Sequence, residues 1–153
     1  MMNEQKSNPS SKPNKGLSNK QLSYKEAGVI GEDAVADFLK RRGHRIITQN
    51  YETFFGELDI VSIVNGTLVF TEVKTKQNTY YGEAWRSLTP SKRRSVKKSA
   101  YRFIKDSCWD WTVPYYVHGI RFNLKYERCR YDFAEVLLNG ERAEQIIYTK
   151  NAI

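Results

Sequence analysis

The sequence predicts one α/β domain in which a mixed β-sheet is flanked by helices. Two segments place apolar residues at helical spacing, and six shorter segments have strand-like composition, in the order α-β-β-β-α-β-β-β. Two Asn-Gly pairs, Asn65-Gly66 and Asn139-Gly140, indicate tight turns between consecutive strands. The length of 153 residues fits one ordinary domain, which we expect to span residues 23–153.

The composition indicates a domain with a real core and a polar exterior. Hydrophobic residues make up 40% of the chain and aromatic residues 13%. The longest apolar runs fall far short of the ~20 residues that a membrane-spanning helix needs, so we expect no membrane partner. Residues 1–22 are rich in Ser, Asn, Lys and Pro and predict a disordered tail. Because this tail lacks a secretory signal, we expect cytoplasmic localisation.

The cysteines and histidines do not indicate a zinc site. The two cysteines, Cys108 and Cys129, are too few for a disulfide framework, and the sequence has no CxxC motif. Both are therefore expected to be free thiols. Neither His44 nor His118 has a Cys or His at metal-ligand spacing, and both are expected on strand surfaces.

The net charge points to an anionic partner. Lys and Arg number 25 against 17 Asp and Glu, a formal charge of +8. The tail holds only four lysines and one glutamate, so most of the excess belongs to the domain. Proteins that bind a phosphate backbone often have such an excess of basic residues. An excess that serves only solubility gives the same composition.

The first helix is expected from Ser23 to about Arg42. Ser23 and Glu26 have capping-box spacing, in which each side chain satisfies a backbone N–H at the helix start. Glu32 falls at one edge of the apolar stripe and Asp37 at the other, so helix geometry does not choose between these two acids. The stripe itself consists of Ala27, Ile30, Ala34, Val35, Phe38 and Leu39.

The remaining elements are bounded by turn and cap residues. Thr89-Pro90 predicts an N-cap and a first helical residue, and this second helix is expected to run to about Asp106. Strands are expected at about 44–51, 57–64, 67–74, 115–126, 131–138 and 144–149.

The hairpin around Asn65-Gly66 places charged residues together. A two-residue loop fixes a register in which Asp59 lies opposite Glu72 and Glu57 lies opposite Lys74, all on one face. Opposed carboxylates repel, so a shared proton, a protein cation or a metal ion must compensate. Two acids and one lysine leave a net negative site, which favours a divalent cation. Acid pairs at solvated strand ends also occur without any function.

The second helix is basic over most of its length. Residues 89–105 contain no acid, whereas a solvated face normally interleaves both signs, so we predict that the helix binds phosphates. Aromatic residues in the preceding loop are candidates for base stacking or for packing. The candidate nucleic-acid-binding residues are Lys92, Arg93, Arg94, Lys97 and Lys98. The loop aromatics are Tyr80, Tyr81 and Trp85.

These motifs resemble a known family. GELD (56–59) followed by TEVK (71–74) is similar to the PD-(D/E)xK nuclease core, with Asp59 matching its aspartate and Glu72-Val73-Lys74 its ExK. Three further segments indicate which family within this superfamily the sequence resembles: GVIGEDAVADFLKRRGHRII, QNYETFFGELDIV and YGEAWRSLTPSKRR. Together they resemble the bacterial YraN-like family, itself similar in its core to archaeal Holliday junction resolvases. The likeness covers residues 28–153.

The resemblance implies a restriction-endonuclease-like fold and a Mg²⁺- or Mn²⁺-dependent endonuclease. It implies a nucleic-acid partner, with DNA favoured over RNA, and a homodimer. Asp59, Glu72 and Lys74 would be catalytic, and Glu32 would join Asp59 and Glu72 as a metal ligand. Lys92 matches the lysine of the family's TPxK segment.

One departure and two alternatives stay open. Many relatives read RFD in a later strand, where this sequence has Arg121-Phe122-Asn123. A nucleic-acid-binding module with weak or no catalysis would carry the same residues. A protein-interaction adaptor would explain the basic surface alone.

Overall fold

The computed structural model describes residues 21–77 and 88–153. Residues 1–20 of the predicted tail, and the loop aromatics Tyr80, Tyr81 and Trp85, lie outside these ranges. The described elements are α1 (Tyr24–Arg41), β1 (Arg45–Thr53), β2 (Gly56–Val64), β3 (Thr67–Gln77), α2 (Pro90–Ser107), β4 (Thr112–Val117), β5 (Ile120–Lys125), β6 (Arg128–Asn139) and β7 (Arg142–Thr149).

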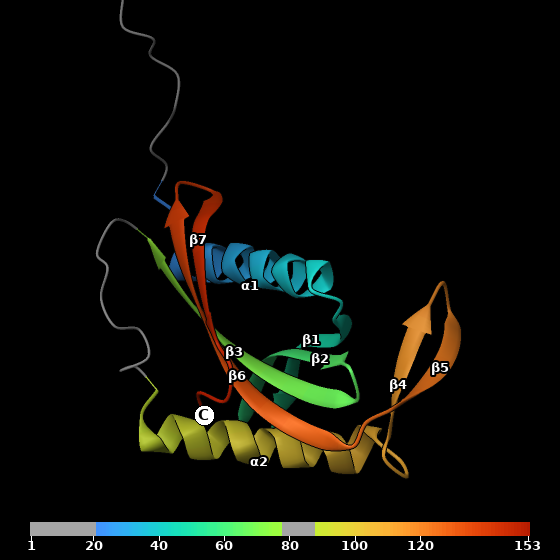
Figure 1. Cartoon of the computed structure of the whole chain (residues 1–153). Coiled ribbons are helices and arrows are strands. Elements are labelled where there is room, and N and C mark those ends of the chain that lie inside the picture. The colour runs from blue at the N-terminus through green and yellow to red at the C-terminus, as the bar shows by residue number, and fades with distance from the viewer. Residues whose placement is uncertain (1–20, 78–87) are drawn as a thin grey trace, which may run out of the picture.

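Five strands form one mixed sheet in the order β1-β2-β3-β6-β7. The pairs β1–β2, β2–β3 and β6–β7 are antiparallel, whereas β3 and β6 are parallel and joined by a crossover that contains α2. Helix α1 covers one face of the sheet and α2 lies against the other (Figure 1). The predicted α/β fold with a mixed sheet flanked by helices is confirmed, and it is compatible with a restriction-endonuclease-like core.

The single strand predicted at 115–126 is wrong. The segment is a hairpin, β4 and β5, that forms its own two-stranded sheet and projects from the body of the molecule (Figure 1). His118 and Gly119 make the turn, with φ of 48° and 79°. Positive φ at both central positions suits the right-handed twist of a hairpin. His-Gly is a less familiar turn pair than Asn-Gly, and this concealed the turn.

Helix α1 begins as predicted and packs very closely on the sheet. Ser23 and Glu26 form the capping box, with Ser23 Oγ accepting from Glu26 N at 3.1 Å. Gly31 faces Thr75 of β3 so closely that a Cβ atom at residue 31 would collide with the threonine side chain. Ala36 is buried in the helix–sheet contact, whereas the predicted stripe residue Ala34 is only half-buried.

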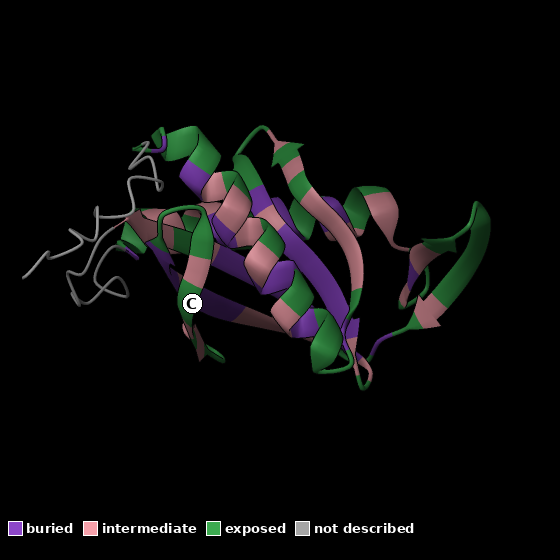
Figure 2. Ribbon diagram, turned by 90° about the horizontal axis from the view of Figure 1, so that it is seen from above, coloured by how far each residue is buried: buried purple, intermediate pink, exposed green. Residues whose placement is uncertain are grey.

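The sheet separates two hydrophobic cores, and Figure 2 shows the buried residues concentrated along its central strands. The α1-side core contains Val35, Leu39, Ile60, Ala134, Val136 and Leu138. The α2-side core contains Leu58, Val61, Leu68, Phe70, Val96 and Phe103. Burial on both faces explains why β2 and β3 are apolar on both sides.

The cysteines and histidines fall in different environments. Cys108 and Cys129 are free and half-buried, as predicted. His44 is not a surface residue: it is buried, and its Nδ1 hydrogen-bonds Ser62 Oγ at 2.9 Å. His118 is exposed in the β4–β5 turn. No helix within the described residues is long and apolar enough to cross a membrane.

Candidate metal and nucleic-acid site

The β2–β3 ladder ends where the acidic residues begin. The predicted register holds from Val64–Thr67 to Ile60–Thr71 and stops there. The expected backbone pairs Asp59–Glu72 and Glu57–Lys74 therefore do not form.

Beyond the last β2–β3 backbone pair, the carboxylate of Asp59 hydrogen-bonds the backbone of β3. Its Oδ2 accepts a hydrogen bond from Val73 N at 2.7 Å. Leu58 and Val61 both pack in the α2-side core while Ile60 packs in the α1-side core, so the alternation of β2 is interrupted at Asp59. On the neighbouring strand β1, Asn50 has a φ of 51°. Such irregularities often re-aim a side chain at a strand end.

Glu72 is nearly buried and is paired with a cation from α2. Lys92 Nζ lies 2.7 Å from Glu72 Oε1. Thr89 caps the helix by accepting from Lys92 N at 3.1 Å, which places Lys92 in the first turn, beside β3. The cation that neutralises Glu72 is thus Lys92, whereas the sequence pointed to Lys74.

Glu32 reaches the same region from α1. Asn50 Nδ2 donates to Glu32 Oε2 at 2.6 Å, which ties the helix to β1. Burial raises the pKa of Glu32, and the charges of Glu57, Asp33 and Glu72 add to this, while the Asn50 hydrogen bond opposes it. Asn50 was missed from the sequence because nothing separates one asparagine in a strand from another.

We call Glu32, Asp59 and Glu72 the acidic cluster. Burial, followed by the charge of Glu72, raises the pKa of Asp59 far above its ordinary value. The Val73 hydrogen bond and Lys92 oppose this rise, and Glu32 contributes to it. Burial lowers the pKa of Lys92, but its bond to Glu72 and the nearby acids raise it by more. With all three carboxyl groups ionised, the cluster would carry more negative charge than its one bound lysine offsets, and the raised pKa of Asp59 reflects this.

Lys74 stands apart from these contacts. It is exposed on β3 and forms no ion pair within residues 21–77 and 88–153. In the part of the chain that the structure describes, no three Asp, Glu, His or Cys side chains converge closely enough to hold a metal ion. The carboxylates of the acidic cluster thus affect one another through their charges, but in this structure they do not converge on one ion position.

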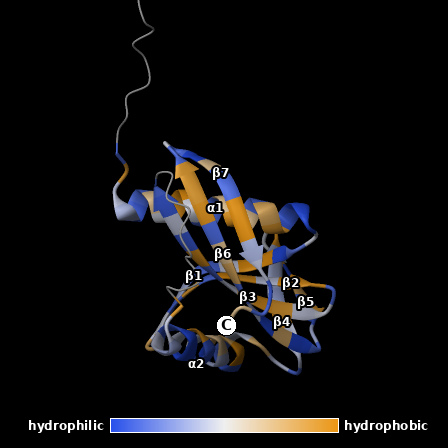
Figure 3. Ribbon diagram, turned by 60° about the vertical axis from the view of Figure 1, so that its left-hand side comes forward, coloured by the Kyte–Doolittle hydropathy of each residue, from blue (hydrophilic) through white to orange (hydrophobic). Residues whose placement is uncertain are grey.

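Helix α2 presents most of its cations to solvent, and hydrophilic residues run along it in Figure 3. Of the five predicted nucleic-acid-binding residues, Lys92 is paired with Glu72 and Arg93 is bonded to backbone carbonyls. Arg93 Nε donates to Leu88 O at 3.1 Å and its Nη1 to Ala152 O at 2.9 Å. Arg93 therefore holds the C-terminal segment against α2, while Arg94, Lys97 and Lys98 are exposed.

Two aromatic residues lie next to these cations. Phe54 and Phe55 form the β1–β2 turn; Phe54 is 97% exposed, and Lys98 Nζ lies 5.6 Å from the centroid of the Phe55 ring. Gly56 follows with a φ of 133° and packs against Ser95 of α2. In the sequence, Phe54 and Phe55 stand immediately before Gly56, and this pattern could have indicated an exposed aromatic turn.

The departure at Arg121-Phe122-Asn123 falls on the projecting hairpin. Asn123 is exposed on β5 and accepts a hydrogen bond from Arg121 Nε at 3.2 Å. An Arg-aromatic-Asp triplet does occur in β6, at 130–132, where Asp132 is fully buried and bonded to Arg130. Asn123 is thus no replacement for an aspartate in the main sheet.

The mixed sheet between two helices, with Asp59 and Glu72-Val73-Lys74 on adjacent strands, is compatible with the core of PD-(D/E)xK nuclease-type proteins. The family model of the uncharacterised protein family UPF0102 matches residues 31–136. The chain belongs to this family, the YraN-like group of nuclease-type proteins.

Several UPF0102 proteins are similar to this chain. One from Dictyoglomus turgidum is 30% identical over 118 residues, covering 77% of this chain and 87% of its own length. One from Persephonella marina is 30% identical over 125 residues, covering 82% and 90%. One from Geobacter sulfurreducens is 43% identical over 77 residues, covering 50% and 60%.

Proposed function

We propose that this protein is a metal-dependent endonuclease that hydrolyses phosphodiester bonds in structured DNA or RNA. The observation that carries the proposal is the acidic cluster, which lies beside helix α2, a helix whose one acid is Asp106 near its C-terminal end. A carboxylate site attracts a divalent cation, and a basic helix attracts the phosphate backbone. Membership of the nuclease-type family supports the same assignment.

The donors of the acidic cluster suit Mg²⁺ or Mn²⁺. All three side chains offer carboxylate oxygens, the ligands that hard cations prefer. Asp59 Oδ1 accepts no hydrogen bond from the described residues, so it is free to bind an ion. Glu72, Glu32 and the Val73 carbonyl would complete the set. The bound ion would supply Lewis acidity and lower the pKa of a coordinated water.

The bond between Lys92 and Glu72 would change if a bound ion took both oxygens of Glu72. At 2.7 Å, the ammonium lies on one of these two oxygens, Oε1. Lys92 would then be released toward the incoming phosphate, next to the other cations of α2. Lys74 is assigned to orient the attacking water or to stabilise negative charge that develops on the phosphate.

A nucleic-acid-binding module without efficient cleavage is the second candidate. The observation that favours it is the same pair: Glu72 is already satisfied by Lys92, and no three ligating side chains converge within the described residues. In this case α2 and the Phe54–Phe55 turn would bind nucleic acid, and Lys92 would stay on Glu72.

The test uses the full chain and a panel of labelled single-stranded, duplex and branched DNA and RNA. Cleavage is measured with Mg²⁺, with Mn²⁺ and with EDTA, and binding is measured separately by fluorescence anisotropy. We expect metal-dependent cleavage that Asp59→Asn and Lys74→Ala abolish while folding and binding persist. Asp37→Asn, an exposed change on the same helix as Glu32, serves as the control and should cleave normally.

The outcomes separate the candidates. Salt-sensitive binding without cleavage in any metal would overturn the endonuclease and leave the binding module. Equal cleavage by the wild type, Asp59→Asn and Lys74→Ala would show a contaminating nuclease and refute the assigned site. Failure to bind any nucleic acid at low salt would refute both candidates in favour of a protein adaptor.

A further inference from the structure

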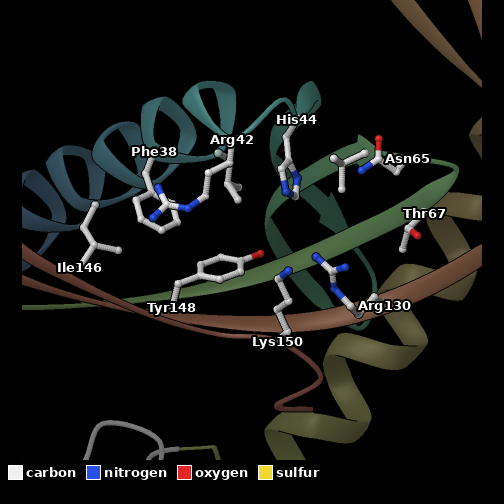
Figure 4. Close-up of a pocket in the computed structure, with 11 residues that line it drawn as sticks. Phe38, Arg42, His44, Asn65, Thr67, Arg130, Ile146, Tyr148 and Lys150 are labelled. Atoms are coloured by element: carbon white, nitrogen blue, oxygen red, sulfur yellow. The ribbon is translucent and has the colours of Figure 1, made fainter.

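A pocket lies on the α1 face of the sheet, at the turn end of the β2–β3 hairpin. It has a volume of about 680 Å³ and is bounded by the last turns of α1, the Asn65 turn and strand β7. Figure 4 shows the polar ends of His44, Arg130, Tyr148 and Lys150 directed toward one region of this pocket. Small-molecule sites have volumes of roughly 300–1,000 Å³.

A buried carboxylate fixes the polar wall of the pocket. Asp132 is fully buried and accepts three bonds from Arg130, with Nε at 2.9 Å from Oδ1 and 3.0 Å from Oδ2, and Nη2 at 2.8 Å from Oδ2. Tyr148 donates its hydroxyl to Asp132 at 2.6 Å, and Asn151 donates its backbone N–H at 3.0 Å. Asp132 therefore orients an arginine, a tyrosine and the turn that carries Lys150.

The lining of the pocket is cationic beyond what Asp132 neutralises. Arg42, Arg130 and Lys150 line it, and no acid does. In the part of the chain that the structure describes, neither Arg42 nor Lys150 has an acidic partner. Burial, followed by the charge of Arg130, lowers the pKa of His44 to about 4; Lys150 contributes to this, while Asp132 opposes it. Because three cations and no acid line the pocket, the pocket is electropositive and favours an anion.

The opposite wall is apolar and partly aromatic. The Arg42 guanidinium lies 3.6 Å from the centroid of the Phe38 ring, and the Phe38 and Tyr148 rings lie 5.5 Å apart. Leu39, Val64 and Ile146 complete this wall. An ion as small as phosphate would leave it uncovered, whereas a planar organic group would pack against it.

We propose that this pocket binds a small phosphate monoester with a planar body, the chemical class of a nucleoside monophosphate. The phosphate would lie between Arg130 and Lys150, and the planar body against Ile146 and the Arg42 guanidinium that covers the Phe38 ring. Five to six residues of β2 separate the pocket from Asp59, a distance of roughly 15–20 Å along the strand. The site is therefore separate from the acidic cluster and does not depend on the proposed function.

The proposal is tested by titrating the full chain with AMP, adenosine and inorganic phosphate and following backbone amide signals by NMR. AMP should cause saturable shifts around Asn65, Arg130 and Lys150, phosphate should bind more weakly, and adenosine should cause no saturable shift. Lys150→Ala should weaken AMP about tenfold, the equivalent of one charge-assisted hydrogen bond. Lys125→Ala removes the same charge from exposed β5 and should not change AMP binding.

Three results would overturn the proposal. Equal weakening by Lys150→Ala and Lys125→Ala would show only non-specific attraction to a basic protein. Adenosine binding as tightly as AMP would exclude recognition of the phosphate, and phosphate binding as tightly as AMP would exclude a role for the apolar wall. Arg130 is kept unchanged in these experiments because its removal would leave Asp132 buried without its cation.

Discussion

Asp59 illustrates how one residue can serve a binding site at a cost in stability. Burial and Glu72 raise its pKa, so the folded chain keeps a proton there that the unfolded chain loses. The folded state is therefore disfavoured progressively as pH rises from the ordinary carboxyl pKa to the raised value. A bound cation would remove this penalty, and a neutral side chain should do the same.

We accordingly predict that Asp59→Asn raises the free energy of unfolding by about 1–3 kcal/mol at pH 8 in EDTA, measured by urea denaturation. The asparagine oxygen still accepts from Val73, and its amide can donate toward Glu72. Asp37→Asn, on the exposed face of α1, should change stability little. A decrease in stability on Asp59→Asn would show that burial and Glu72 do not destabilise the ionised form of Asp59 in the folded chain.

His44 gives the opposite pH dependence. Its pKa is about 4 in the folded chain against about 6.5 when unfolded, so both states are neutral above pH 6.5. As pH falls from 6.5 to 4, the unfolded chain gains a proton that the folded chain refuses, and stability is lost. Between pH 7.5 and 4.5 the wild type should lose roughly 2 kcal/mol more than His44→Gln, by urea denaturation at both values. Equal losses would mean that His44 titrates normally.

At the scale of elements, the contact between α1 and β3 fixes where Glu32 lies. Gly31 precedes Glu32, and a methyl group at residue 31 would collide with Thr75. Gly31→Ala should therefore push the helix outward and lower the free energy of unfolding by about 1–3 kcal/mol. Gly28→Ala on the same helix meets nothing within 4 Å and should instead stabilise by about 0.5–1 kcal/mol. Thermal denaturation compares the two, and stabilisation by both would refute the close contact.

Local signals predicted most elements well. The capping box at Ser23, the Thr89 cap and the Asn65-Gly66 turn each depend on neighbouring residues, and each is present as predicted. The predicted hairpin register was also correct, but only from the turn to the pair Ile60–Thr71, where the pairing of β2 with β3 ends. The ladder ends at Ile60 because β2 is distorted beside Asn50, and that distortion depends on three strands at once. No two-strand argument reveals it.

The site was harder to predict than the fold for a related reason. Lys92 meets Glu72 across 20 residues of sequence, through the docking of α2 on the sheet. Lys74 is close to Glu72 in sequence and is nevertheless exposed without a partner in the described chain. Arg93 looks like its neighbours in sequence but is bonded to the backbone of Leu88 and Ala152. Charge composition predicts a basic helix, whereas packing decides which of its cations are free.

At the scale of the whole molecule, the two helices lie on opposite faces of the sheet, so their cations can be tested separately (Figure 1). Affinity for duplex DNA falls with salt, with a log–log slope of about 0.9 for each phosphate that the protein neutralises. Lys97→Ala combined with Lys98→Ala on α2 should therefore reduce the slope by about 0.9 per lysine and weaken binding to all duplex sequences alike. Lys25→Ala combined with Lys40→Ala removes equal charge from α1 and should leave the slope nearly unchanged, because these exposed lysines belong to the helix on the opposite face of the sheet from α2. Fluorescence anisotropy at several salt concentrations measures both slopes. An equal reduction by the two pairs would mean that net charge, rather than the surface of α2, attracts nucleic acid.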